Sequence, residues 1–367
     1  MRKIVLLLLL FIIMFLFGCA YGADYHGGAE PDQESAATPA SSKEPALLNI
    51  EVGHSEDGTV TKQDVIKAGL AAGLCVENED RYMDWKDTPY TVTFAPEAVK
   101  IEIMAFYRCG SLVGMTIPDS MTELEKPLGS LNLTYITVTP ENEVYKDIDG
   151  ILFSKSGDML VTYPRGRPSS QYIIPDGTIT IGWDAFGASN MTEVIIPDSV
   201  TEISSSAFSG CGDLSKIIIP DGVTAINDYT FNNCTALAEI ILPNGLNEIG
   251  LEAFQGCTGL TTVTIPSGVI RFGGGAFFKC ENLSSVWFTG SNSFDFGDKE
   301  DESAFEGCSD DLVVYCPEGD ESWDKIEREG LPFDGQLKNR HCKPDSLLMA
   351  FAWLKSPNII LNFNMSL

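Results

Sequence analysis

Histidine is scarce in this sequence. The chain holds three histidines, His26, His54 and His341, and none lies beside an obvious nucleophile. The GxGxxG, P-loop, HExxH and GxSxG motifs are all absent, and no Ser, His and Asp have the spacing of a catalytic triad. We therefore expect no enzymatic activity and no cofactor.

Positive charge is also scarce. Lys and Arg together number 24 against 52 Asp and Glu, which gives a net charge of −28. A chain with this balance repels phosphate backbones, so nucleic acid is excluded as a partner. The hydrophobic fraction of 44% is nevertheless that of a globular protein. A length of 367 residues predicts two or three domains or one long repeat array.

The conspicuous apolar runs are too short to span a bilayer, which takes about 20 residues. The run at Ile4–Phe17 has 14 residues and follows Arg2 and Lys3, as in the apolar region of a signal peptide. It ends in Leu-Phe-Gly-Cys, which resembles the lipobox of bacterial lipoproteins. That resemblance implies cleavage after residue 18 and lipid attachment at Cys19. The alternative is an ordinary secretory signal that is cleaved a few residues later.

Residues 19–46 are rich in Gly, Ala, Ser, Pro and acidic residues. Because such a segment has little apolar surface to bury, we expect a flexible acidic tether. It would hold a folded body away from the membrane.

One phrase repeats along the middle of the chain. Each copy contains a proline, a phenylalanine 11 residues later, a cysteine three residues after that, and then a leucine. The prolines are Pro175, Pro197, Pro220, Pro243 and Pro266, and the phenylalanines are Phe186, Phe208, Phe231, Phe254 and Phe277. Both series have spacings of 22, 23, 23 and 23 residues. A fixed period of this length predicts a solenoid.

Weaker copies flank the regular ones. An earlier copy contains Phe106 and Cys109, and a later copy contains Phe305 and Cys308 after a five-residue insertion. Residues 122–172 depart from the phrase and include the segment Asp149-Gly-Ile-Leu-Phe. We interpret this stretch as an irregular island within the repeats.

The phrase resembles the BspA-like, or Treponema pallidum-type, leucine-rich repeat family. The segment Ile196–Ile217 is close to the consensus of that family, and the Asp-Gly-Ile-Leu-Phe segment resembles an island that its members carry. The resemblance implies a leucine-rich-repeat-like solenoid, mainly β with short strands and turns, capped at both ends. It also implies a bacterial cell-surface lipoprotein that binds host matrix proteins, host cells or other bacteria.

The predicted domain order follows from these observations. We expect a signal peptide at 1–18, the tether at 19–46, an N-terminal cap at 47–90 and repeats at 91–317. A C-terminal cap at 318–343 and a tail of unknown role at 344–367 complete the chain.

The repeat period also predicts how each unit is built. About 23 residues cannot bury their own apolar face, so stacked units are expected to share one continuous core. The Leu-x-x-Val/Ile-x-Ile segment before each proline predicts a short strand that the proline ends. The phenylalanines are expected in the core.

The ten cysteines allow more than one interpretation. In an exported chain they suggest disulfides, but six of them occur once per repeat at a core-facing position, which favours small buried hydrophobic residues. Cys75, Cys316 and Cys342 are left without an assigned pairing. No CxxC motif or accompanying histidine predicts a metal site.

Two carboxylate groupings are candidate calcium sites. Asp57 and Asp64 have part of an EF-hand spacing, but position one of that loop would be Gly53. A turn followed by a helix starting near Thr61 explains this stretch better. The acidic run 298–302 is interpreted as a solvated loop.

Strand alternation predicts a binding surface. In each strand the third and fifth positions point outward. The fifth positions are Ile195, Ile218, Ile241, Thr264 and Trp287, and the third positions include Glu193, Lys216 and Glu239. An exposed apolar row beside polar residues marks an interaction surface. The alternative is that β-branched residues simply suit exposed strands.

These features predict a lipid-anchored, monomeric binding module at the cell surface. We expect its ligand to be an extracellular-matrix or cell-surface protein. Two alternatives stay open, namely a lipoprotein that captures a glycan or peptide and a structural envelope protein without a soluble ligand.

Overall fold

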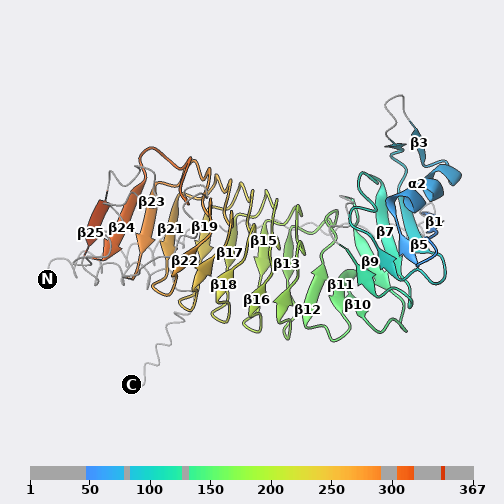
Figure 1. Ribbon diagram of the computed structural model, residues 1–367, viewed down its shortest axis with the longest axis horizontal. Helices are drawn as coiled ribbons and strands as arrows, with labels where there is room; N and C mark the ends of the chain where they lie inside the picture. Colours follow the sequence, from blue (N-terminus) through green and yellow to red (C-terminus); the bar gives the residue numbers. More distant parts are fainter. Residues whose placement is uncertain (1–46, 78–82, 126–131, 291–303, 318–339, 344–367) are drawn as a thin grey trace, which may run out of the picture. The chain divides into compact units, whose positions relative to one another are not determined.

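The computed structural model describes residues 47–77, 83–125, 132–290, 304–317 and 340–343 (Figure 1). The predicted signal peptide, the tether with Cys19, the acidic run 298–302, most of the C-terminal cap and the tail lie outside these residues. In the described part, successive stretches of about 23 residues each form one coil of a β-solenoid. The predicted fold class is therefore confirmed.

Each coil places one longer strand beside the equivalent strand of the next coil. In the N-terminal part these parallel strands are β1 (Leu48–Val52), β5 (Tyr90–Phe94), β7 (Leu112–Ile117) and β9 (Tyr135–Val138). In the regular repeats they are β13 (Gln171–Ile173), β15 (Glu193–Ile195), β17 (Lys216–Ile218) and β19 (Glu239–Ile241). The last group is β21 (Thr262–Ile265), β23 (Ser285–Phe288), β24 (Val313–Pro317) and β25 (Arg340–Lys343). The strands predicted before the prolines at 175, 197, 220, 243 and 266 are thus present.

A second set of parallel strands, only two residues long, follows the longer strands and, in the regular repeats, lies after the prolines. In the N-terminal part they are β2 (Thr59–Val60), β6 (Lys100–Ile101) and β8 (Glu123–Leu124). In the regular repeats they are β14 (Thr180–Ile181), β16 (Glu202–Ile203), β18 (Ala225–Ile226), β20 (Glu248–Ile249) and β22 (Arg271–Phe272). The sequence did not predict these strands, because two residues are too few for a visible alternation.

Each coil then turns through two residues in the left-handed region, four positions apart. In one regular coil these are Ser206, with a φ of 58°, and Gly210, with a φ of 74°. The equivalent pair in the next coil is Tyr229 and Asn233, with φ values of 58° and 57°. Side chains with a Cβ rarely adopt this conformation, so the turn is held by its neighbours in the stack.

The phenylalanines of the regular repeats form a continuous column in the core. Phe186, Phe208, Phe231, Phe254, Phe277 and Phe305 are each 0% exposed. Consecutive rings in this column lie 5.0–5.4 Å apart with interplanar angles of 2–9°. Such offset stacking adds to the free energy gained by burying each ring. The predicted core register is therefore confirmed.

The six repeat cysteines are buried beside this column and are not in disulfides. Cys257 donates from Sγ to the carbonyl oxygen of Phe231 at 3.1 Å, and Cys280 makes the same contact to Phe254. Burial raises the pKa of the Cys257 thiol to about 12, so it stays protonated and donates. In the last sheet, backbone register places Cys342 opposite Cys316.

The core is divided into two clusters rather than forming one continuous core. The island of residues 122–172 contains β10 (Tyr145–Ile148), β11 (Ile151–Ser154) and β12 (Met159–Thr162), which pair antiparallel. Within β11, Ile151 and Phe153 join the cluster of the regular repeats, whereas Leu152 joins the N-terminal cluster. A strand that is buried on both faces therefore separates the two cores, which explains why the repeat phrase is lost here.

The N-terminal part adds the helix α2 (Lys62–Ala71) and the antiparallel pair β3 (Cys75–Glu77) and β4 (Met83–Trp85). Thr61 caps α2 through a capping box with Asp64, as the predicted turn and helix require. The ring of Trp85 stacks on Tyr90 with the centroids 5.6 Å apart. Among the described residues, no helix has the length and apolar character needed to cross a bilayer.

Candidate functional site

The outer side of the longer strands carries the residues that alternation selected. We define the strand face as the third and fifth positions of the strands in the regular repeats, namely Ile195, Ile218, Ile241, Thr264, Trp287, Glu193, Lys216 and Glu239. In β15 and β17 the middle residue is buried and both neighbours are exposed. The strands β17 and β19 run side by side (Figure 1). Their parallel pairing aligns Lys216 with Glu239 and Ile218 with Ile241.

The fifth positions form an apolar row that is most exposed at its N-terminal end. Ile195 is 49% exposed and Ile218 is 38% exposed. Ile241, Thr264 and Trp287 are half-buried. The row thus presents branched aliphatic side chains to solvent on successive coils, and an aromatic side chain follows after Thr264.

The third positions are joined by polar contacts along the sheet. Lys216 Nζ lies 3.2 Å from Glu239 Oε2, and Gln171 donates from Nε2 to Glu193 Oε2 at 3.0 Å. Because Lys216 and Glu239 remain about half exposed, this pair contributes at most about 1 kcal/mol to stability. These contacts orient the polar row beside the apolar one.

Two residues of the same surface were missed in the sequence. Ile173 lies opposite Ile195 in register and is 67% exposed, the highest value in the apolar row. The sequence did not reveal it because it directly follows the irregular stretch, although it precedes Pro175 by the usual two residues. Tyr315 lies opposite Trp287, and their rings stack with the centroids 3.8 Å apart at 10°. The insertion before Phe305 concealed that register.

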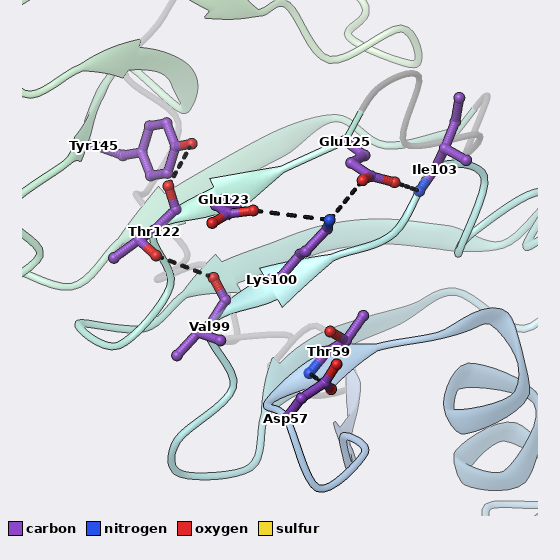
Figure 2. A network of polar contacts seen from close by, with 9 residues as sticks. All are labelled: Asp57, Thr59, Val99, Lys100, Ile103, Thr122, Glu123, Glu125 and Tyr145. Atoms are coloured by element: carbon purple, nitrogen blue, oxygen red, sulfur yellow. Dashed lines mark hydrogen bonds and ion pairs between the residues drawn. The ribbon is translucent and has the colours of Figure 1, made fainter.

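A separate polar network lies on the short strands of the N-terminal part. Lys100 Nζ is 2.6 Å from Glu125 Oε1 and 3.8 Å from Glu123 Oε2 (Figure 2). Glu125 Oε2 accepts a hydrogen bond from the Ile103 amide at 3.0 Å. The bond from Lys100 lowers the pKa of Glu125, and the same bond raises the pKa of Lys100. The network is an exposed ion cluster that joins adjacent coils.

The carboxylates considered for calcium take part in local structure. Asp57 accepts hydrogen bonds from the Ser55 hydroxyl at 2.6 Å and from the Thr59 amide at 3.0 Å, which lower its pKa to about 2. Asp64 caps α2. Within the described residues, no three His, Cys, Asp or Glu side chains gather as a metal site requires.

His54 joins the loop after β1 to the next coil. Its Nδ1 lies 2.7 Å from the carbonyl oxygen of Ser55, and its Nε2 lies 2.7 Å from that of Pro96. Carbonyl oxygens only accept, so both contacts are hydrogen bonds only when both ring nitrogens carry protons. The bonds to Ser55 and Pro96 raise the pKa of His54, and the charges of Glu97 and Asp64 act in the same direction.

A pH dependence follows from His54. Because the folded-state pKa is raised, its stabilising contribution is fully present below the unfolded pKa of about 6.5 and is lost as pH rises through the folded value. Between the unfolded and the folded-state pKa of His54, we expect the melting temperature of the wild type to fall as pH rises. His54→Gln cannot titrate, so its melting temperature should lack this fall. An NMR titration of the ring protons measures the pKa directly. A pKa at or below about 6.5 would contradict the double contact.

The repeat sequence itself decides the family. A model of the BspA type leucine rich repeat region matches residues 87–158 and 167–284 in six copies. The chain belongs to the BspA-type leucine-rich repeat family. Members of this family are typically surface-exposed bacterial proteins, and their repeats are typically binding modules rather than catalysts.

Solved structures of other leucine-rich repeat proteins are similar. The pneumococcal vaccine antigen PcpA is 18% identical with a TM-score of 0.52, over 81% of this chain and 68% of that one. A leucine-rich repeat protein from Eubacterium ventriosum is 23% identical with a TM-score of 0.48, over 61% of this chain and 66% of its own. This chain therefore spans just under two thirds of the Eubacterium protein. The T. pallidum leucine rich repeat protein is 29% identical with a TM-score of 0.38, over 48% of this chain and 80% of that one.

No curated protein matches the chain significantly. The likeness to PcpA supports the fold, and the family assignment supports a protein-interaction module in general.

Proposed function

We propose that the BspA-type repeats form a cell-surface adhesin that binds a host-matrix or cell-surface protein through the strand face. The observation that carries the proposal is the apolar row, in which exposed isoleucines recur at one register position on successive coils. A monomeric globular surface seldom exposes apolar side chains in contiguous patches without an interaction role. Solenoids use such extended surfaces for binding.

The proposal includes the route to the surface. The N-terminal sequence favours export by a signal peptide at 1–18 and lipid attachment at Cys19, with residues 19–46 as a tether. Two or three acyl chains anchor a protein durably, because each buried CH₂ contributes about 0.8 kcal/mol. The N-terminal cap, repeats, C-terminal cap and tail would follow in that order.

A binding assay tests the adhesin. Full-length protein is applied to immobilised matrix proteins and glycans, together with Ile195→Ser and Trp287→Ala. We expect saturable binding to a matrix protein that both substitutions weaken. The matched control is Ile270→Ser, since Ile270 and Ile195 are both 49% exposed but Ile270 precedes the short strand β22. If Ile270→Ser weakens binding as much as Ile195→Ser does, the strand face is not the binding site.

A second candidate function is glycan capture. The stacked Trp287 and Tyr315 favour it, because aromatic side chains combine a large apolar surface with a polar group. Binding to glycans alone, abolished by Trp287→Ala, would replace the adhesin with this function.

A fractionation experiment tests the anchor. We expect Cys19→Ser to release the protein from the membrane fraction, because the thiol that carries the lipid is lost. Measurement is by immunoblotting of membrane and soluble fractions. If the variant stays in the membrane fraction, the anchor proposal is wrong.

A further inference from the structure

The apolar row of the strand face is bordered by carboxylates on both sides. Its four isoleucines on consecutive coils are Ile173, Ile195, Ile218 and Ile241. On one side, at the third strand positions, lie Glu193 and Glu239 together with Lys216. On the other side each strand runs through an aliphatic residue and a proline into a turn. The exposed first residues of three successive turns are Asp176, Asp198 and Asp221.

The charge around the row is strongly unbalanced. In these four strands and the turns that follow them, five carboxylates face a single cation, Lys216. Lys216 is already paired with Glu239. The border therefore carries net negative charge, in a chain whose total is −28. Any ligand that buries the isoleucines must approach these carboxylates, and a cationic ligand gains from doing so.

The spacing of the row selects the shape of the ligand. Neighbouring strands in a sheet lie about 4.8 Å apart, so the row offers one isoleucine per 4.8 Å. An α-helix laid across the strands brings one apolar residue to the same side every turn, or about 5.4 Å. An extended segment brings one only every 6.8 Å or so, and falls out of step within two coils.

We propose that the isoleucine row binds a cationic amphipathic helix of a partner protein, lying across β13, β15, β17 and β19. The apolar side of that helix packs on the isoleucines. Its lysines or arginines reach Asp176, Asp198 and Asp221 on one side and Glu193 and Glu239 on the other. This inference rests on the proposed function, and it specifies the chemistry of the partner that the strand face binds.

The test uses designed peptides and the full-length protein in detergent micelles. The first probe is an 18-residue peptide of leucine and lysine with the leucines at helical spacing. A second peptide has glutamate in place of lysine. A third has the composition of the first with strict alternation, which favours an extended strand. Affinity is measured by fluorescence anisotropy, and induced helix by circular dichroism of the peptide.

Matched pairs of variants locate the binding. Ile195→Ser with Ile218→Ser removes the centre of the row, whereas Ile179→Ser with Ile270→Ser removes two isoleucines that are 43% and 49% exposed and directly precede the short strands β14 and β22. We expect the first pair to weaken the leucine–lysine helix at least 10-fold and the second pair less than twofold. Asp198→Asn with Asp221→Asn should weaken it about 3- to 10-fold and reduce its salt dependence. Glu202→Gln, on β16, should change neither the affinity for the leucine–lysine helix nor its salt dependence.

The possible outcomes distinguish a failure of this inference from a failure of the proposed function. If the glutamate helix or the alternating peptide binds as tightly as the lysine helix and is sensitive to Ile195→Ser with Ile218→Ser, the strand face binds ligands but the inferred partner is wrong. If the two isoleucine double variants weaken the binding of every peptide equally, the peptides are attracted unspecifically to the acidic protein. The inference is then overturned. A matrix protein whose binding still depends on Ile195 would in that case preserve the adhesin.

Discussion

Phe254→Ala should lower the free energy of unfolding by about 3–5 kcal/mol. Phe254 is 0% exposed and lies between Phe231 and Phe277, with ring centroids 5.4 Å and 5.0 Å away. Its removal leaves a cavity in the middle of the column and interrupts stacking on both sides, and neighbouring coils cannot close it without breaking their own register. Thermal and denaturant unfolding measure the effect.

Phe278→Ala is the matched control for this prediction. Phe278 is a phenylalanine in the next coil, half-buried, with Lys279 Nζ 4.8 Å from its ring centroid. It lies outside the column, so its loss should cost about 1 kcal/mol or less. A melting temperature for Phe254→Ala within one degree of the wild type would show that the column does not carry the core.

The column illustrates what the sequence could predict. A residue that recurs every 22 or 23 positions must occupy equivalent places in stacked coils, so the period together with their apolar character placed the phenylalanines and cysteines inside. Strand alternation likewise assigned Ile195 and Ile218 to the outside. Both arguments need only local spacing and a repeated environment.

The structure of the island could not be predicted from spacing and repetition. Its strand β11 is buried on both faces by two different cores, and neither core is visible in the local pattern of residues 145–162. The Asp149-Gly150 pair, with φ values of 52° and 75°, is the hairpin signal that could have been used. Ile173 and Tyr315 belong to the strand face but sit beside the island and the insertion. Their place on the strand face is therefore seen only from the pairing of their strands with β15 and β23.

Asn142 is another residue whose role only the structure reveals. It is 0% exposed, in the turn between β9 and the island strand β10. Its Nδ2 donates to the carbonyl oxygens of Pro118 at 2.7 Å and Met121 at 2.9 Å. Its Oδ1 accepts from the amides of Val144 at 2.9 Å and Tyr145 at 2.7 Å. One side chain thus ties the preceding coil to the start of the island.

Asn142→Asp should cost about 3–5 kcal/mol at neutral pH, because it sets a buried carboxylate against two carbonyl oxygens and removes both donors. The shape is unchanged, so packing does not explain the loss. Burial raises the folded-state pKa of the new carboxyl. The cost should therefore be full above that pKa and shrink as pH falls from it toward the unfolded value of about 3.9. Denaturant unfolding at several pH values measures both features.

Asn282→Asp provides the control, because Asn282 also donates from Nδ2 to a carbonyl oxygen, that of Thr258 at 2.8 Å, but is exposed. Water solvates a carboxylate there, so its cost should stay within about 1 kcal/mol. Asn142 bonds to Met121, which belongs to the N-terminal cluster, and to Tyr145, which packs against that cluster, so its loss should also reduce amide-exchange protection in β7 and β9 while β17 and β19 keep theirs. Equal loss of protection in all four strands would mean that the two clusters unfold as a single unit. The island would then be a continuation of the core rather than a boundary within it.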